Sequence, residues 1–464
     1  MATVELTLTT DQIKPSIEEL KHILRENGIA GAGGAGFPAY GKLSPKINTL
    51  ILNCAECEPL IQVHRQMLAL HAKAILAALN LVATVVGAAE ILIALKPSYK
   101  ETIEAVEAVM HQYPKVKLCF LKEAYPVGDE VITIYEATGK VVPPGSIPIE
   151  VGVAVFNVET AYNIYQAVEK QQPVTTKYLT IAGEVEHPVT VKLPIGMTIK
   201  EAVSFAGKIT TEDFVFISGG PMTGSVAKGH DLITKTSNAI LVLPRDHFVV
   251  RKKMSNDVID MQRAMASCCQ CRMCTDLCPR YLLGHPIEPH AFMRSATTGV
   301  TKDLNPFLDT FFCSSCGLCE MFSCMQNLSP RSMITSYKNG LIQNGVKRPE
   351  QPRWEEVNKI RDYRMVPEDR LVARIDLEKY EKKAPLFEGL KDAGCVNILL
   401  KQHIGAPAFS IVSKGQQVFA GEKIAEAVAD SLSLPVHASI DGIVTEICDT
   451  YIAITKSSKG GSEE

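Results

Sequence analysis

Two cysteine-rich runs between residues 268 and 324 restrict the fold of this 464-residue chain more than any other feature of its sequence. The first run, SCCQCRMCTDLCPR, contains a C-x2-C-x2-C-x3-C pattern followed by Pro279. Three thiolates at this spacing can hold three corners of a 4Fe–4S cube, while the fourth cysteine reaches elsewhere. The second run, CSSCGLCEMFSC, repeats the pattern with one extra residue before its last cysteine. The two runs therefore predict an α-helical domain with two 4Fe–4S clusters.

The ligands of each cluster follow from the way paired runs of this kind bind iron. The fourth cysteine of each run ligates the cluster of the other run. We therefore predict one cluster on Cys268, Cys271, Cys274 and Cys324, and a second on Cys313, Cys316, Cys319 and Cys278. Cys269 points away from the first set, so we expect it to pack in the protein or to face solvent. Zinc is the alternative metal, but structural zinc usually takes two C-x2-C pairs instead of two runs of four cysteines.

Composition and charge exclude several classes of function. Hydrophobic residues make up 46% of the chain and charged residues 21%, as in a folded soluble protein. The net charge of −3 gives no electrostatic case for nucleic acid binding. The N-terminus is too acidic and polar for a signal peptide, which predicts a cytoplasmic location. The apolar stretch 74–95 contains Asn80 and Glu90, and we interpret it as a buried helix running into a buried strand instead of a transmembrane segment.

The length of the chain requires several domains. Residues 1–170, the N-terminal domain, alternate helical and strand patterns as an α/β domain does. Residues 171–245 show a hairpin pattern, one helix and a further strand, which predicts a small β-grasp domain. The cysteine runs place the cysteine-rich domain at 246–345.

The remaining residues divide into three segments. Residues 346–390 are charged and contain prolines, which is typical of a linker. Residues 391–456, the C-terminal domain, contain short strands separated by turns and resemble the biotinyl/lipoyl-type hammerhead fold. No lysine stands in a carrier-type hairpin there, so we do not expect a group carrier. Residues 457–464 are expected to be a disordered tail.

The stretch AGAGGAGFPAYGK, residues 30–42, contains a literal G-x-G-x-x-G match. A dinucleotide-binding Rossmann turn needs a strand before the glycines and a helix after them. Here a helical pattern at 16–27 comes first, so the match fails in its context. Successive glycine amides followed by Lys42 can still form a cradle for another phosphate. We call residues 30–42 the glycine loop.

Three further motifs indicate which kind of phosphate ligand the glycine loop binds. They are LNCAECEP after the strand pattern at 47–53, AYPVGDE at 124–130 and FNVETAYN at 156–163. Together with the loop they resemble the FMN- and NADH-binding domain shared by the flavoprotein subunit of respiratory complex I and the C subunit of the Rnf complex. The resemblance implies that the N-terminal domain binds FMN and NADH.

The same resemblance implies roles for individual residues. The FMN phosphate would lie on Gly33, Gly34, Gly36 and Lys42, and the flavin would contact Asn53, Asn157 and Thr160. Glu58 and Glu130 match acidic, catalytic positions on the nicotinamide side. The sequence departs from the motif at Ala55, where complex I has an aspartate, so the resemblance does not carry over the ribityl contact at that position.

The order of the domains indicates which of the related families this chain resembles most. The Rnf C subunit shares the flavin motifs, the β-grasp module of SLBB type and both cysteine runs, but its barrel-sandwich (hammerhead) domain is N-terminal. Here the corresponding motifs QHIGAPA and VHASIDG lie at the C-terminal end, within 401–444. This order, and the longer gap before Cys324, resemble the cobalamin reductases of propanediol-utilising bacterial microcompartments. The predicted fold class is therefore a multidomain α/β and β protein with FMN/NADH-binding, SLBB-type, two-cluster ferredoxin-like and barrel-sandwich parts.

The resemblance implies an enzyme that oxidises NADH and passes electrons through FMN and two clusters to cobalamin inside a microcompartment. It also implies a shell protein or an adenosyltransferase as a partner. An Rnf C-like protein that delivers electrons to another protein is the alternative, and a ferredoxin-like scaffold with a vestigial flavin site is a third interpretation. His285, His290, His403 and His437 are candidate axial ligands of cobalamin, although a lone histidine in a turn is more often structural.

Overall fold

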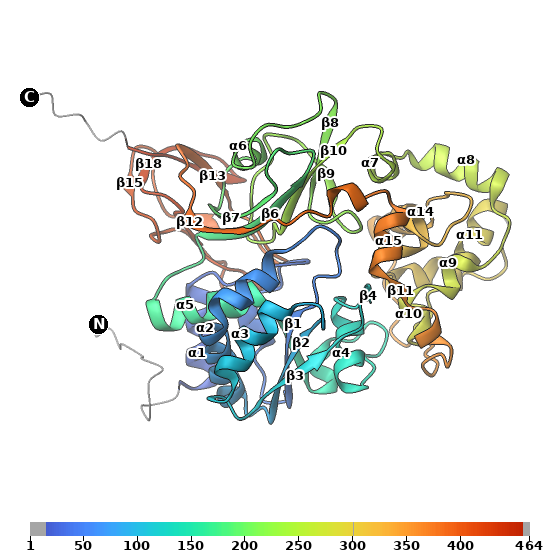
Figure 1. Cartoon of the computed structure of the whole chain (residues 1–464), viewed down its shortest axis with the longest axis horizontal. Coiled ribbons are helices and arrows are strands. Elements are labelled where there is room, and N and C mark those ends of the chain that lie inside the picture. The colour runs from blue at the N-terminus through green and yellow to red at the C-terminus, as the bar shows by residue number, and fades with distance from the viewer. Residues whose placement is uncertain (1–14, 300, 458–464) are drawn as a thin grey trace, which may run out of the picture.

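The computed structural model describes residues 15–299 and 301–457. The start of the N-terminal domain, residues 1–14, and residues 458–464 of the predicted tail lie outside the described part. Figure 1 shows the N-terminal domain, in blue and cyan, below the green β-grasp domain and the red C-terminal domain. The yellow helices of the cysteine-rich domain lie to one side of both layers.

A four-stranded parallel sheet with strand order β3-β2-β1-β5 forms the centre of the N-terminal domain. Its strands are β1 (Thr49–Cys54), β2 (Glu90–Leu95), β3 (Val116–Phe120) and β5 (Val153–Asn157). Strands β1, β2 and β5 are almost entirely buried, as parallel strands are when helices cover both faces of a sheet. Asn53 and Asn157 are paired at the carboxyl ends of β1 and β5, so two predicted flavin residues meet at one sheet edge.

Helices cover both faces of this sheet. Helices α1 (Ile17–Glu26), α2 (Val63–Val86), α3 (Lys100–Met110) and α5 (Val158–Lys170) share one core, whereas α4 (Glu130–Thr138) packs on the opposite face. Among the described residues, α2 alone is long and apolar enough to span a membrane by length and composition. It packs against α3 and α5, and half of its most apolar window is buried in the protein. The stretch 74–95 thus forms the end of α2 and then β2, as predicted.

The glycine loop follows α1 and leads into a short 3-10 helix, η1 (Ala39–Lys42). Helix α1 begins with a capping box, in which Ser16 Oγ accepts from Glu19 N and the Glu19 carboxylate accepts from Ser16 N. A helix therefore precedes the glycines where a Rossmann fold would have a strand.

The β-grasp domain is a mixed sheet with strand order β12-β7-β6-β10-β8-β9. Strands β6 and β7 form the predicted antiparallel hairpin, and β10 lies parallel to β6. Its own elements are β6 (Thr176–Gly183), β7 (Val189–Pro194), α6 (Ile199–Ser204), β8 (Phe214–Ser218), β9 (Ser225–Ala227) and β10 (Ala239–Pro244). Strand β12 comes from the segment 346–390, for which the sequence predicts a linker.

The cysteine-rich domain consists of short helices around a small apolar core that includes Phe292, Met293 and Ile334. Its helices are α7 (Phe248–Lys253), α8 (Asp257–Ser267), α9 (Met273–Asp276), α10 (Pro279–Leu282), α11 (Pro289–Thr298), α12 (Asn305–Leu308), η3 (Asp309–Phe312), α13 (Leu318–Met321) and α14 (Pro330–Gln343). Several cysteines lie at or near the ends of the shortest helices, so the thiols are held by turns instead of long elements.

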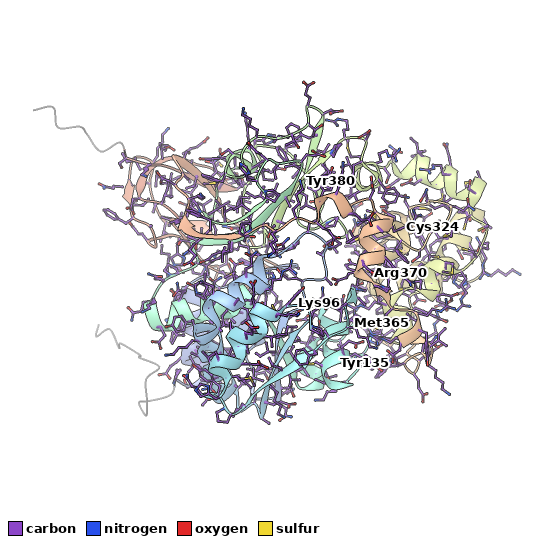
Figure 2. All side chains as sticks on the ribbon, in the orientation of Figure 1. Lys96, Tyr135, Cys324, Met365, Arg370 and Tyr380 are labelled. Atoms are coloured by element: carbon purple, nitrogen blue, oxygen red, sulfur yellow. The ribbon has the colours of Figure 1, made fainter. Side chains whose placement is uncertain are left out.

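Residues 346–390, predicted as a linker, form ordered elements that connect two domains. Strand β11 (Val366–Pro367) pairs with β4 (Ala124–Tyr125) of the N-terminal domain, and β12 (Leu386–Leu390) pairs with β7 of the β-grasp domain. Between and around them lie η4 (Arg361–Tyr363), α15 (Glu368–Arg374) and η5 (Glu378–Tyr380). Buried Lys96, just after β2, bonds to Glu368 at the start of α15. Figure 2 labels Lys96 and, on α15, Arg370. The sequence did not predict these elements, because the segment is rich in charged residues and prolines and has only a few buried apolar residues, such as Leu371 and Tyr380.

The C-terminal domain has a four-stranded sheet, β13-β19-β18-β15, and a three-stranded sheet, β14-β16-β17. Buried Val396, Ile424 and Ile454 belong to its core, as the predicted sandwich requires. The strands are β13 (Cys395–Leu399), β14 (Phe409–Ser410), β15 (Gln417–Val418), β16 (Lys423–Glu426), β17 (Val436–His437), β18 (Gly442–Ile447) and β19 (Tyr451–Thr455).

Candidate functional site: a cavity shared by four domains

One cavity of about 670 Å³ collects all the residues for which the sequence predicted a flavin or nicotinamide role. These lining residues are Gly33, Gly34, Gly36, Lys42, Asn53, Glu58, Glu130, Asn157 and Thr160. The cavity is also lined by residues of the other three domains, namely Thr223, Asn238, Ser314, Cys316 and Ile404. It therefore lies where all four folded domains meet, and we call it the central cavity.

The glycine loop forms one wall of the central cavity. Gly34 and Gly36 have φ angles of +60° and +70°, which glycine adopts without strain. A methyl group on Gly36 would lie 2.8 Å from Thr236 Cγ2 and 3.2 Å from the Gln402 carbonyl oxygen. The β-grasp and C-terminal domains thus press directly on this loop, which explains why a side chain is excluded at residue 36.

A buried ion pair supports the glycine loop from behind. The side chains of Lys177 and Glu159 are each 1% exposed and bond to one another. Lys177 Nζ also donates to the Ala32 carbonyl at 2.8 Å, and Ala32 N donates to Thr160 Oγ1 at 2.9 Å. Lys177 therefore joins the glycine loop to β6. Removal of either member of the pair would leave an uncompensated buried charge, so both are needed to hold the loop there.

Lys42 lies at the end of the glycine loop with one donor still available. Its Nζ donates to the Val155 carbonyl at 2.7 Å and to Glu130 Oε1 at 3.1 Å. An ammonium group has three N–H donors, so one has no hydrogen-bond acceptor in the described part of the chain and can bind a ligand in the central cavity. The structure thus pairs two residues to which the sequence assigned separate tasks, the phosphate for Lys42 and the nicotinamide for Glu130.

The predicted flavin amides are already held by the protein. Asn53 Nδ2 donates to the Gly128 carbonyl at 2.9 Å, and Asn53 Oδ1 accepts from Ala55 N at 3.1 Å. Asn157 caps α5, because its Oδ1 accepts from Glu159 N at 2.9 Å. These bonds orient the amides before any ligand arrives, although they use part of the hydrogen-bonding capacity of each.

Glu58 uses both carboxylate oxygens to bind the β-grasp domain. Its Oε2 accepts from Met222 N at 2.9 Å, and its Oε1 accepts from Thr223 N at 2.8 Å and from Thr223 Oγ1 at 2.5 Å. Gly220 lies so close that a methyl group there would be 2.1 Å from Glu58 Oε2. Glu58 therefore ties the N-terminal domain to the turn at residues 219–224 as well as lining the central cavity.

The central cavity is also lined by Glu56 and His64, to which the sequence assigned no role. Glu56 lies within the LNCAECEP motif, and His64 lies outside every motif. Buried Glu56 accepts from His64 N at 2.6 Å and from Arg65 N at 3.2 Å, and so satisfies the first amides of α2. His64 Nε2 lies 3.1 Å from Asn157 Nδ2, and burial lowers the pKa of the His64 imidazole to about 3. The imidazole is therefore neutral at physiological pH and can accept from the Asn157 amide.

Ala55, where the sequence departs from the complex I motif, does not reach the central cavity, whereas Asn238, which no motif indicated, does. The Ala55 side chain is fully buried and is not among the residues lining the central cavity, so no polar group replaces the aspartate of the complex I motif there. Asn238, which no motif indicated, lines the cavity, and its buried Oδ1 has no hydrogen-bond partner among the described residues. Leaving a buried acceptor unpaired costs about 1–3 kcal/mol, so this oxygen fits a ligand that donates to it.

The second cysteine run adjoins the central cavity. Cys316 lines the cavity, and Tyr125, another lining residue, donates from its hydroxyl to the Cys316 carbonyl at 2.6 Å. Arg280 Nη2 contacts both carboxylate oxygens of Asp129 at 2.9 Å, and the two side chains are 15% and 16% exposed. Since Asp129 caps α4 beside the cavity, this ion pair joins the cysteine-rich domain to the wall of the site.

The structure brings the cysteines of each predicted set near one another, although among the described residues no group of three or more His, Cys, Asp or Glu side chains is arranged to hold a single metal ion. The two sets of cluster ligands therefore remain a prediction. Cys268, Cys271, Cys274 and Cys324 line one small hollow, which we call the outer set. Cys278, Cys316 and Cys319 each lie near enough to Cys313 to interact electrostatically with it, and we call these four cysteines the inner set, although Cys278 and Cys319 also interact with Cys274 of the outer set. Figure 2 labels Cys324 within the cysteine-rich domain. Cys269 is exposed, as is Cys271, and it lines the same hollow as the outer set.

Both sites suit the groups that the sequence implies. The central cavity combines a glycine loop that excludes side chains, one remaining ammonium donor and an unpaired amide oxygen, which fits a phosphate ester with hydroxyl groups such as FMN. Burial raises the pKa of the Cys274 and Cys278 thiols to about 12. Such thiols are neutral without iron and lose their protons when iron binds, as cluster ligands must.

The four candidate cobalamin ligands are mostly engaged within the chain. His285 Nε2 lies 3.0 Å from the Val142 carbonyl, and His403 Nε2 accepts from Leu434 N at 3.2 Å. His290 bonds to Thr275, and burial lowers the pKa of His437 to about 3. Buried or bonded imidazoles of this kind favour the structural interpretation.

Comparison with known families assigns each domain. In chain order, residues 24–166 match the Nuo51 FMN-binding domain, 178–225 the SLBB domain, 267–329 a 4Fe–4S dicluster domain and 377–460 the RnfC barrel sandwich hybrid domain. The predicted fold class is therefore confirmed. A chain that carries FMN and 4Fe–4S clusters in these domains is a flavo-iron–sulfur oxidoreductase that transfers electrons.

Two curated relatives extend over the whole chain. The cobalamin reductase PduS of Citrobacter freundii is 37% identical over 98% of this chain and 100% of its own length. The protein of the same name from Salmonella typhimurium is 37% identical over 98% of both chains. The C subunit of a proton-translocating ferredoxin:NAD(+) oxidoreductase complex from Clostridium ljungdahlii is 33% identical over 58% of this chain and 57% of its own. The chain belongs to the cobalamin reductase PduS family.

Proposed function

We propose that this chain is an NADH-dependent cobalamin reductase that works inside a bacterial microcompartment. The main observation that supports this proposal is that Cys316 of the inner set lines the same cavity as the predicted flavin residues. The full-length relatives named as cobalamin reductases support the choice of cobalamin as acceptor. The relative named for a ferredoxin:NAD(+) oxidoreductase supports the choice of a nicotinamide donor.

The protein groups around the central cavity would bind and orient the donor and the cofactor. When bound, FMN accepts a hydride from NADH and releases the two electrons singly to iron–sulfur clusters. Gly33, Gly34, Gly36 and Lys42 would hold its phosphate, and Asn53, Asn157 and Thr160 would contact the remainder. Glu58 and Glu130 would stand at the nicotinamide side, where Glu130 also sets the direction of the Lys42 ammonium.

The positions of the two cysteine sets give an order to the electron path. The inner set would hold the cluster next to the central cavity, because Cys316 and Ser314 line that cavity. The outer set would hold the cluster that passes electrons on, because Cys271 and the adjacent Cys269 are exposed. Each NADH supplies two electrons and one proton, which is enough to take cob(III)alamin to cob(I)alamin.

Anaerobic spectroscopy tests the proposal directly. Purified protein with its iron, sulfide and flavin contents measured is mixed with NADH and hydroxocobalamin, and the cob(III)alamin spectrum is followed. Its loss, at a rate that depends on protein concentration, is the expected result. Cys316→Ser protein is the matched control, because it retains the flavin residues but lacks one ligand of the inner set.

The Rnf C-like alternative predicts a different pattern. Flavin and clusters would then be reduced by NADH while the cob(III)alamin spectrum stayed unchanged, and the protein would sediment with membranes of the source cell. Co-purification with microcompartment shells, or with an adenosyltransferase, would instead support the proposed location and partners. A preparation without flavin would favour the scaffold interpretation and contradict the proposal.

A further inference from the structure

We propose that Asn238 of the β-grasp domain is a positioning residue for FMN and contacts its ribityl phosphate chain. The inference rests on the proposed use of the central cavity as the flavin site. It adds a contact from a second domain to a site that the motifs place entirely in the N-terminal domain.

The first observation is the state of the Asn238 amide. Its Oδ1 is buried and has no hydrogen-bond partner among the described residues. The other two amides of the central cavity, Asn53 and Asn157, are both engaged by backbone groups. Asn238 is thus the amide in this cavity whose acceptor capacity is unused, and buried polar groups in native proteins are nearly always paired.

The second observation is the place of this amide relative to the glycine loop. A methyl group on Gly33 would come within 2.9 Å of Asn238 Nδ2 and 3.8 Å of Asn157 Nδ2. Asn238 therefore packs directly over the loop that is expected to hold the phosphate. A ribityl chain in this position offers hydroxyl groups that can donate to the amide oxygen, and hydroxyl or phosphate oxygens that can accept from the amide nitrogen.

The third observation explains why the contact crosses a domain boundary. Asn238 stands immediately before β10, and β10 lies parallel to β6, where Lys177 bonds to the Ala32 carbonyl of the glycine loop. Lys235, in the same turn, donates from Nζ to the Gly28 carbonyl at 2.7 Å. The turn at 234–238 is therefore bonded to Gly28, just before the glycine loop, and the Asn238 carbonyl accepts from Thr180 N of β6, the strand that also holds the loop. These contacts fix the position of the amide.

Flavin titration of the apoprotein tests this role without NADH or cobalamin, so its outcome is independent of the acceptor. In Asn238→Ala protein, the FMN dissociation constant measured by fluorescence quenching is expected to rise about tenfold, the effect of one lost hydrogen bond. Asn238→Asp is expected to weaken FMN more than riboflavin, because a carboxylate repels the phosphate that riboflavin lacks. The variants are expected to fold, since the amide oxygen has no partner among the described residues that its replacement would lose.

Ser237→Ala is the matched control. Ser237 belongs to the same turn, but its hydroxyl bonds to Thr234 and does not line the central cavity. This variant should leave the FMN dissociation constant within about twofold of the parent, as a substitution outside the site does. Equal FMN affinity in the parent, Asn238→Ala and Asn238→Asp proteins would overturn the proposal. An Asp variant that weakens FMN and riboflavin alike would also overturn it, because the contact would then lie at the ring instead of the ribityl phosphate.

Discussion

The two cysteine sets have almost the same spacing but very different surroundings. The inner set lies against the N-terminal domain, where Tyr125 bonds to the Cys316 carbonyl and Arg280 bonds to Asp129. The outer set lies in a hollow of about 30 Å³ beside exposed Cys269 and Met325. Local spacing predicts a cluster for both sets, whereas the structure separates them: Cys316 of the inner set lines the central cavity, and no cysteine of the outer set does so.

This difference means that the two sets should fail in different ways. Loss of a ligand from the inner set should interrupt electron transfer from the flavin to both clusters and to the acceptor. Damage to the outer set should leave the first part of the path intact. The predictions below, ordered by expected effect, test this comparison.

The largest effect is expected from removal of one ligand of the inner set. Cys316→Ser should lower the iron content by about half and abolish reduction of the remaining cluster by NADH, because the path is cut next to the flavin. Bleaching of the flavin by NADH should persist. Iron analysis, electron paramagnetic resonance and stopped-flow absorbance measure the three quantities.

Cys274→Ser, in the outer set, is the paired variant. It should lose a similar amount of iron, but NADH should still reduce the inner cluster. If NADH reduced the surviving cluster in Cys316→Ser and not in Cys274→Ser, the order of the two sets would be the reverse of the one proposed.

The second effect concerns the ion pair that joins the inner set to the cavity wall. Arg280→Ala leaves Asp129 without its guanidinium partner, so we expect a loss of about 2 kcal/mol in unfolding free energy. Transfer from flavin to cluster should also slow, because Arg280 lies two residues after Cys278. Urea unfolding and stopped-flow absorbance check the two results.

Arg245→Ala provides the control for this prediction. Arg245 pairs with Asp213, but both side chains are more than half exposed. Removal of an exposed pair should cost no more than about 1 kcal/mol and leave the transfer rate unchanged. Equal effects of the two variants would mean that the Arg280 contact does not position the cluster.

The third effect is a pH dependence of the same interface. Burial, with a contribution from Arg280, lowers the pKa of His285 to about 4, although Asp129 and the Val142 carbonyl oppose the shift. The unfolded chain binds a proton near pH 6.5 and the folded chain does not, so stability is complete above that pH and is lost as the pH falls towards 4. The loss should amount to about 1.4 kcal/mol per pH unit in this window.

His285→Gln separates this contribution from those of other histidines. The glutamine cannot titrate, so the slope of unfolding free energy against pH between 4 and 6.5 should be smaller than in the parent protein. His64 and His437 remain in both proteins and cancel in the difference. Identical slopes would show that His285 does not titrate with folding.

The smallest effect is expected at Cys269. Its thiol is exposed and belongs to neither set, so Cys269→Ser should leave the iron content unchanged and alter the unfolding free energy by less than about 0.5 kcal/mol. Iron analysis of this variant beside Cys271→Ser sharpens the ligand assignment. Loss of iron from Cys269→Ser alone would show that the outer set uses a different cysteine.

Much of the fold could be predicted because its signals are local. The strand pattern before Asn53, the helix before the glycine loop and the short turns of the C-terminal domain all appear as runs of neighbouring residues. The segment 346–390 was harder, because its anchors are single buried residues such as Leu371 and Tyr380 among charged ones. Isolated apolar residues produce no periodicity that a sequence pattern can reveal.

The sequence brought together residues that line one cavity, but it did not reveal the bonds that these residues make. Every residue of the N-terminal domain to which the motifs assigned a flavin contact lines the central cavity. The motifs could not show that Glu58 is bonded to Thr223 or that Lys42 is paired with Glu130. These partners are far apart in the chain, and their meeting depends on how distant segments and whole domains pack.

By itself, the sequence determined that this protein carries two four-thiol sets, a glycine loop that is not a Rossmann turn and a set of flavin motifs, because residue type and spacing are enough for each. Only the tertiary structure decided which thiol set faces the flavin residues, and that an asparagine from another domain lines the same cavity. The physical reason is that three of the four cysteines of each set stand in one short run of chain, where spacing alone reveals them. The distance between redox sites and the pairing of buried amides are instead set by contacts between domains.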